Sequence, residues 1–273
     1  MKEFHTRTVW GFIFVSAILS AVLLSSYTFV LIFLTLSVFV LREFYSLCHK
    51  AGFSPQIYPG LFAGAIIFVL SYFVAEKTIP SKAFCFLLPL IYALPVYELF
   101  RKKKNPLANI ALTEFGIIYV SIPFAMLNFL VFKESEGIVT YDYKLLISLF
   151  VFVWASDSGA YFFGVRFGRH RLFKRISPKK SWEGLIGGVF TAICAAAILT
   201  FVFPEYNFVL LGVMAIIVVI SGTFGDLVES MIKRSISVKD SGRFMPGHGG
   251  LLDRFDSILL ASPVIFFVVQ FFH

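Results

Sequence analysis

Long apolar stretches recur along this chain, and short polar connections separate them. A bilayer core is crossed by roughly 20 apolar residues in a helix, so these stretches favour membrane-spanning helices. Hydrophobic residues make up 58% of the chain and charged residues 15%, a balance that a water-soluble globule of this size could not bury. We therefore predict an all-α, polytopic integral membrane protein with about nine transmembrane helices. The predicted segments are residues 8–24, 27–41, 57–74, 83–99, 115–131, 145–165, 185–203, 208–225 and 251–272.

Lysine and arginine are distributed unevenly among the connections. The N-terminus and the connections after the second, fourth, sixth and eighth segments hold 20 of the 24 Lys and Arg residues, counting Arg254 at the rim of the last segment. By the positive-inside rule, the N-terminus and these connections are cytoplasmic and the C-terminus lies outside. The net charge of +8 is then explained by cytoplasmic loops and anionic lipid, so we expect no nucleic-acid partner. Because no organelle-targeting sequence is evident, we expect a bacterial plasma (inner) membrane.

One carboxylate lies inside a predicted membrane helix: Asp157, in segment 145–165. An intramembrane charge costs about 2.5–3.5 kcal/mol at the bilayer centre on insertion scales, so Asp157 is a candidate functional residue. The alternative is a structural hydrogen bond from Asp157 to a neighbouring helix.

The connection after that segment is strongly basic and ends in the run Ser177-Pro178-Lys179-Lys180-Ser181-Trp182-Glu183-Gly184. Pro178 is expected to fix a turn just before a helix start. Backbone N–H groups at a helix N-terminus attract anions, so phosphate is the expected ligand. The alternative is general attraction to lipid headgroups. The candidate phosphate ligands are Ser177, Lys179, Lys180 and Ser181.

A second polar cluster extends from Gly225 to Asp256. If the eighth helix continues past the membrane, four of its residues form one stripe, which Glu229 borders. Asp253 and Asp256 are three residues apart and share a helix face. The members of the stripe are Asp226, Ser230, Lys233 and Arg234.

Three carboxylates near one membrane rim would repel one another without a cation. Hard oxygen ligands close to phosphate-binding lysines suit Mg²⁺. We therefore predict a site for Mg²⁺, with room for a second cation. Its predicted ligands are Asp226, Asp253 and Asp256, with Asp157 as a further candidate.

The run Pro246-Gly247-His248-Gly249-Gly250 lies between the two acidic helices. Its glycines let backbone N–H groups approach an anion closely. His248 would donate to a phosphate or, alternatively, cap the following helix.

These clusters together favour a membrane enzyme that transfers a phosphoryl-type group from a polyanionic donor. Such a reaction needs charge neutralisation and in-line positioning more than a special nucleophile. The chain has no GxxxxGK[ST], HExxH or GxSxG motif. We expect residues 1–143 to form an N-terminal transmembrane scaffold. We expect residues 144–273 to form a C-terminal transmembrane catalytic region with its site at the cytoplasmic rim.

The run from Ser230 to Asp256 resembles the signature of the phosphatidate cytidylyltransferases, also called CDP-diacylglycerol synthases. The run 177–184 resembles a second segment of that family, in which we expect threonine in place of Ser181. That difference retains the hydroxyl group. The N-terminal half resembles the family only in hydropathy. The residues that carry the resemblance are Ser230, Ile232, Lys233, Arg234, Lys239, Asp240, Gly242, Pro246, His248, Gly249, Gly250, Leu251, Asp253, Arg254, Phe255 and Asp256.

The resemblance implies a homodimeric membrane enzyme that transfers CMP from CTP to phosphatidate, with Mg²⁺ as cofactor. The products would be CDP-diacylglycerol and pyrophosphate, and the partners would be CTP, phosphatidate and bilayer lipid. The implied catalytic residues are Asp226, Asp253, Asp256, Lys233 and His248. The implied substrate-binding residues are Ser177, Lys179, Lys180, Ser181, Arg234, Lys239, Asp240, Arg243 and Arg254.

Two other functions are open at this point. A CTP-dependent kinase of a lipid alcohol would share the nucleotide and the cation but would transfer the γ-phosphoryl group. A transporter or channel for an anionic solute would also account for Asp157 and for broken helices. It predicts solute flux without turnover of CTP.

Overall fold

The structure is a computed structural model that describes the backbone of residues 2–242 and 249–272 and the side chains within 9–242 and 249–271. The chain divides into two compact units. The first is Met1–Asp142 with Ile236–Arg254, and the second is Tyr143–Ser235 with Phe255–His273. Segment 236–254 thus belongs with the first unit by its contacts. The division at residue 143 into a scaffold and a catalytic region stays a prediction.

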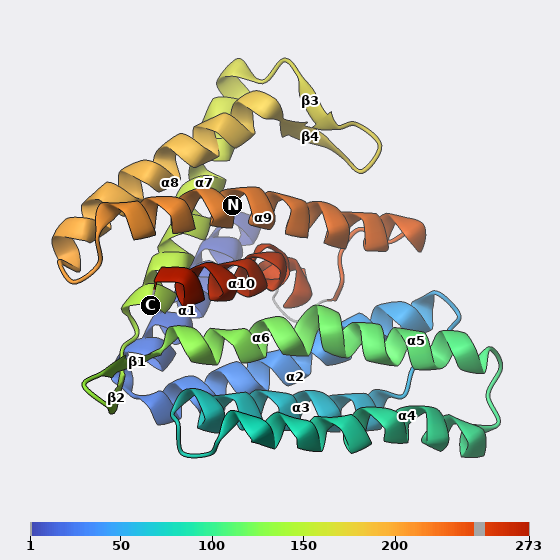
Figure 1. The fold of residues 1–273 in the computed structure, drawn as a ribbon. Coiled ribbons are helices and arrows are strands. Elements are labelled where there is room, and N and C mark those ends of the chain that lie inside the picture. Colours follow the sequence, from blue (N-terminus) through green and yellow to red (C-terminus); the bar gives the residue numbers. More distant parts are fainter. Residues whose placement is uncertain (1, 243–248, 273) are drawn as a thin grey trace. The chain divides into compact units, whose positions relative to one another are not determined.

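The first unit consists mainly of helices (Figure 1). The predicted break between the first two segments is confirmed, because Ser25 separates the two helices and caps the second. Its hydroxyl accepts the Thr28 N–H at 3.2 Å, and Thr28 Oγ1 accepts the Ser25 N–H at 3.0 Å. The elements are α1 (Lys2–Leu24), α2 (Ser26–Lys50), α3 (Ile57–Ala75), η1 (Ser81–Phe86), α4 (Leu87–Arg101), α5 (Pro106–Gly116), η2 (Ile117–Ser121), α6 (Ile122–Leu127), η3 (Asn128–Leu130), β1 (Phe132–Ser135) and β2 (Ile138–Tyr141).

One buried carboxylate joins three helices at an end of this unit. Glu98, on α4, is only 5% exposed and accepts hydrogen bonds from Gln56 Nε2 at 2.8 Å and Asn109 Nδ2 at 2.9 Å. Arg101 Nη1 donates to the same carboxylate at 2.7 Å. Glu98 is therefore both paired and hydrogen-bonded, as a buried charge must be.

The second unit is also mainly helical, and two of its helices lie side by side (Figure 1). These two helices approach closely at glycines. A Cβ atom on Gly187 of α8 would overlap the Phe163 side chain of α7, so only glycine fits there. Thr191 Oγ1 donates to the Ala155 carbonyl at 2.9 Å across the same interface. Small residues at helix contacts are typical of membrane proteins. The elements are α7 (Lys144–Phe167), β3 (Arg171–Phe173), β4 (Ser177–Ser181), α8 (Trp182–Val202), α9 (Phe208–Ser235) and α10 (Leu252–Phe272), whose first turn belongs to the first unit.

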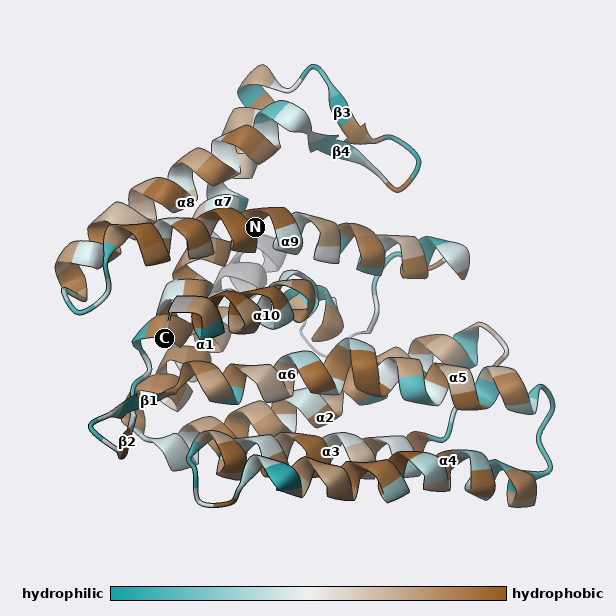
Figure 2. Cartoon of the chain, in the orientation of Figure 1, coloured by the Kyte–Doolittle hydropathy of each residue, from teal (hydrophilic) through white to brown (hydrophobic). Residues whose placement is uncertain are grey.

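Apolar residues cover most of these helices, and polar residues gather around strands β3 and β4 and at helix ends (Figure 2). Within the described residues, seven helical stretches are long and apolar enough to cross a membrane. The prediction of a polytopic membrane protein is confirmed, but the count of nine spans is not. The apolar helix Val9–Leu24 is shorter, and α10 is not among the seven. The seven are Ser26–Lys50, Ile57–Ala75, Ser81–Arg101, Pro106–Leu130, Lys144–Phe167, Trp182–Val202 and Phe208–Ser235.

Two short antiparallel hairpins add strands to a fold that we predicted to be helical throughout. β1 pairs with β2 and β3 with β4, and both hairpins lie in connections between helices. A hairpin pairs backbone groups locally where a connection has no helix in which to satisfy them.

Candidate active site

The basic connection between α7 and α8 is the β3–β4 hairpin. We expected Pro178 to fix a turn, but it lies within β4, where an exposed edge strand tolerates the missing N–H. Glu183, in the first turn of α8, anchors the hairpin. Its carboxylate accepts the His170 N–H at 3.1 Å and lies 2.6 Å from His170 Nδ1. Residues 179–181 therefore enter α8 from an anchored strand.

Lys180 and Ser181 stand directly before α8, at the helix start that the sequence predicts. Lys180 Nζ lies 2.6 Å from Asp226 Oδ2 and donates to the Thr223 carbonyl at 3.4 Å. Ser181 is buried, and its hydroxyl oxygen accepts the Gly184 N–H at 3.1 Å. Ser181 is thus the N-cap of α8, and Lys180 is the lysine directed at an acidic residue.

The helix α9 continues to Ser235, as the predicted stripe requires. Ser230 Oγ donates to Asp226 Oδ1 at 3.1 Å, one turn along the helix. Lys233 Nζ lies 2.5 Å from Glu229 Oε2, and both side chains are buried. The buried pair keeps two opposite charges together at low dielectric.

Three carboxylates of the second unit gather near the start of α10. Ligand atoms of Asp226, Glu229 and Asp256 all lie within 4.8 Å of one another. Gly222 and Gly225 make this possible, because a Cβ atom on Gly225 would overlap the Asp256 carbonyl and one on Gly222 would lie 3.2 Å from Ser257 Cβ. The sequence placed Asp226 and Asp256 in one cation site, and the structure brings these two together.

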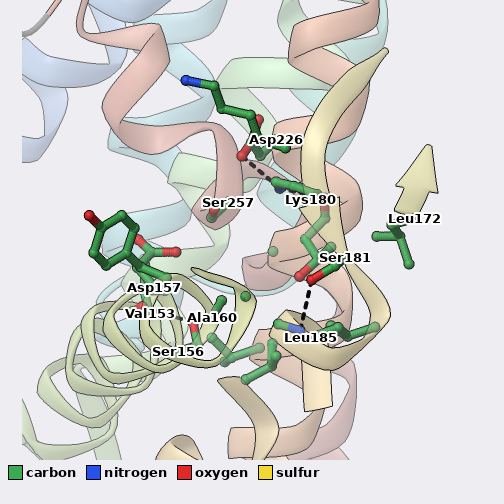
Figure 3. A pocket seen from close by; sticks show the side chains of 18 residues that line it. Val153, Ser156, Asp157, Ala160, Leu172, Lys180, Ser181, Leu185, Asp226 and Ser257 are labelled. Carbon is green, nitrogen blue, oxygen red and sulfur yellow. Dashed lines mark hydrogen bonds and ion pairs between the residues drawn. The ribbon is translucent and has the colours of Figure 1, made fainter. Parts of the chain in front are cut away.

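A cavity of about 230 Å³ lies between α7, α8, α9 and the hairpin. Asp157 of α7, Lys180 of β4 and Asp226 of α9 all line it (Figure 3). Val153, Leu172 and Leu185 form part of its apolar wall. The cavity therefore combines charges of both signs with an apolar lining, as a site for a lipid phosphate would.

Among the described residues, four of the predicted site residues belong to the first unit. The Asp253 carboxylate accepts the Gly250 N–H at 2.7 Å and the Ser241 N–H at 3.1 Å. Through these contacts Asp253 anchors a loop. The role of Asp253 as a cation ligand stays a prediction. Lys239 and Asp240 line a hollow beside α2, and Arg254 is exposed. Arg243 and His248 lie outside the described residues.

The other predicted ligands of the second unit are Ser177, Lys179 and Arg234. Lys179 lines the cavity. Ser177 pairs with Phe173 in the hairpin, at the end away from α8. Arg234 is exposed near the end of α9.

Sequence reasoning did not select Glu229 or Thr223. Glu229 lies three residues after Asp226 and four before Lys233, and this helical spacing was the available signal. Thr223 contributes its backbone carbonyl to Lys180, and no residue type predicts such a contact.

The fold and the cavity define a polytopic membrane protein with an acidic and basic site suited to phosphate groups. The sequence model of the cytidylyltransferase family matches residues 5–272. This chain therefore belongs to the cytidylyltransferase family.

Several relatives bear the name phosphatidate cytidylyltransferase. The Staphylococcus haemolyticus protein is 35% identical over 210 residues, which cover 76% of this chain and 77% of the relative. The Staphylococcus saprophyticus protein is 36% identical over 181 residues, or 66% of each chain. The Staphylococcus aureus (strain COL) protein is 42% identical over 171 residues, or 62% of each. The last two matches span less than two thirds of those relatives' lengths.

Proposed function

We propose that this chain is a phosphatidate cytidylyltransferase, an enzyme of phospholipid biosynthesis. It would transfer CMP from CTP to phosphatidate and release CDP-diacylglycerol and pyrophosphate. One observation carries the proposal: Lys180 and Asp226 meet in a partly apolar cavity among membrane helices, with Asp256 beside Asp226. Such a site suits a reaction between a polyanionic nucleotide and the phosphate of a lipid. The names of the relatives supply the particular reaction.

The lysines of the hairpin would neutralise the phosphates. The Lys180 ammonium group now pairs with the Asp226 carboxylate and could pair with a phosphate oxygen in its place. Lys179 lines the same cavity. In a partly desolvated site, the attraction between one such fixed ammonium group and a phosphate is stronger than in water. The two lysines would therefore bind the triphosphate and offset the charge of the departing pyrophosphate.

Asp226 and Asp256 are the residues that would hold Mg²⁺, with Glu229 beside them. Their clustered ligand atoms are hard carboxylate oxygens, which this cation prefers. Bound there, Mg²⁺ would neutralise phosphate charge and polarise the α-phosphorus of CTP. Asp157 lines the same cavity and stays a candidate ligand for a second cation.

The reaction requires little acid–base chemistry from the protein. A phosphate oxygen of phosphatidate would form the new bond to the α-phosphorus, and the bond from that phosphorus to the bridging β-phosphate oxygen would break. A phosphate monoester is already ionised at pH 7, so no strong general base is needed. The protein's task is to align the two phosphates and to screen their repulsion.

The products test this proposal. Protein purified into nanodiscs is given CTP and phosphatidate, with and without Mg²⁺, and the products are identified by mass spectrometry. We expect CDP-diacylglycerol and pyrophosphate only with Mg²⁺. The matched variant Asp226→Asn should lower the rate by at least about 10- to 100-fold, which is the cost of losing even an outer-shell partner of a metal site. A monophosphorylated lipid made from a lipid alcohol, or solute flux without turnover of CTP, would overturn the proposal.

We further propose a bacterial plasma (inner) membrane location, with the N-terminus and the site cytoplasmic and the C-terminus outside. The distribution of lysine and arginine supports this orientation, and the relatives come from Staphylococcus species. We also propose a homodimer, as the family resemblance implies. The mass of the particle in detergent, measured by light scattering, would check it, and a monomer mass would contradict it.

A further inference from the structure

A carboxylate of the first unit contacts the segment that carries much of the family signature. Glu43, on α2, accepts the Leu252 N–H through Oε2 at 2.7 Å. A Cβ atom on Gly242 or on Gly250 would overlap Glu43 Oε1, so both glycines lie directly against this carboxylate. No sequence motif drew attention to Glu43, because it lies about 200 residues before its partners.

Asp253, which belongs to the same segment, also binds its backbone. Its carboxylate accepts the N–H groups of Ser241 and Gly250, and Gly249 between them takes a φ of +84°, which favours glycine. Two carboxylates thus accept three backbone N–H groups of one segment. Hydrogen bonds from N–H to an ionised carboxylate are stronger than those between neutral groups.

The segment held in this way carries predicted substrate ligands. Lys239 and Asp240 lie immediately before the anchored Ser241 and Gly242, and they line a hollow that also contains Arg42 and Lys50 of α2. A loop without its anchor samples many conformations, and misplacing a binding group by about 1 Å can cost 100-fold in rate.

We infer that Glu43 is a positioning residue that binds segment 236–254 to α2 and thereby sets the geometry of its substrate ligands. The inference rests on the proposed function for the identity of the substrates. It gives α2 of the first unit a part in positioning predicted substrate ligands, whereas the sequence indicated only a scaffold. The carboxylate acts here as a hydrogen-bond acceptor for the Leu252 N–H.

Three variants test this role in nanodiscs. Glu43→Ala removes the acceptor and should lower kcat/KM for CTP by about 100-fold. Glu43→Gln keeps an acceptor oxygen of the same reach and should lose no more than roughly 10-fold. Glu136→Ala, at the exposed β1–β2 turn, removes one carboxylate from the same unit and should match wild type.

Hydrogen exchange supplies a readout that needs no substrate. In Glu43→Ala the amides of residues 249–254 should exchange faster, while those of α3 stay unchanged. Unchanged exchange at 249–254, or equal losses of activity in the alanine and glutamine variants, would overturn the inference. If wild-type protein makes no CDP-diacylglycerol, the proposed function fails, yet hydrogen exchange still tests the anchor.

Discussion

Lys180 connects the two polar clusters of the second unit. It comes from the strand before α8, and its ammonium group lies 2.6 Å from the Asp226 carboxylate of α9. A loop that only attracts lipid headgroups has no need of a lysine directed into a cavity between helices. Lys174, by contrast, lies in the turn of the same hairpin and is exposed. Substitutions at Lys180 and Lys174 can therefore distinguish binding of a specific phosphate from general attraction to lipid headgroups.

We predict that Lys180→Ala lowers kcat/KM for CTP by about 100- to 1,000-fold, the usual cost of removing one group that stabilises a developing charge. Lys174→Ala should stay within about 2-fold of wild type, because an exposed charge contributes little. Steady-state kinetics in nanodiscs that contain anionic lipid would measure both. Equal effects of the two substitutions would favour general headgroup attraction.

At the scale of single elements, the close contact between α7 and α8 depends on glycines. Gly159 faces Thr191, and Gly187 faces the Phe163 side chain, with no room for a Cβ atom at either position. Both helices contribute residues to the cavity, so their spacing also sets its width. On α9, by contrast, a Cβ atom on Gly212 would lie no closer than 3.9 Å to Phe208 Cζ.

Gly187→Ala should destabilise the protein by about 1–3 kcal/mol, because the added methyl group must displace Phe163 or separate the helices. Gly212→Ala is the control and should be neutral or stabilising by a few tenths of a kcal/mol, since alanine loses less backbone entropy in a helix. Thermal unfolding in one detergent would compare them. A Gly187→Ala variant as stable as the control would show that the helices do not pack this closely.

At the scale of the whole molecule, the distribution of lysine and arginine predicts a membrane orientation. The basic run 101–104 begins at the last residue of α4, and the β1–β2 hairpin lies after the next helical stretch. The helical stretch Pro106–Leu130 between them is long and apolar enough to cross a membrane. The two connections should therefore face opposite sides.

Lys103→Cys and Glu136→Cys, each placed in a variant with Cys48, Cys85 and Cys194 replaced by serine, test this orientation. In intact cells, a membrane-impermeant maleimide should label Glu136→Cys, whereas Lys103→Cys should react only after permeabilisation. The physical reason is the cost of moving clustered lysines across the bilayer. The opposite labelling pattern would invert the proposed orientation.

Much of the fold was accessible from local patterns. Apolar length predicted the spanning helices, and Ser25 marked a real helix break, because burial in lipid and helix capping depend on neighbours in the chain. The helix start before Trp182 was visible for the same reason. The prediction that Pro178 fixes a turn was wrong, because the connection forms a short hairpin and Pro178 lies within its second strand. The count of nine spans is not confirmed: among the described residues Val9–Leu24 is a shorter apolar helix, and α10 is not one of the seven long apolar stretches.

The sequence by itself determined the class of protein, the basic rim and the residue types of the candidate site. Only the tertiary structure decided which side chains meet. It placed Glu229 with Asp226 and Asp256, and it set Asp253 against the backbone of segment 236–254. It also brought Glu43 to Leu252. Periodicity records which face of a helix a residue occupies, but contacts between distant helices depend on packing, and here on glycines that permit close approach.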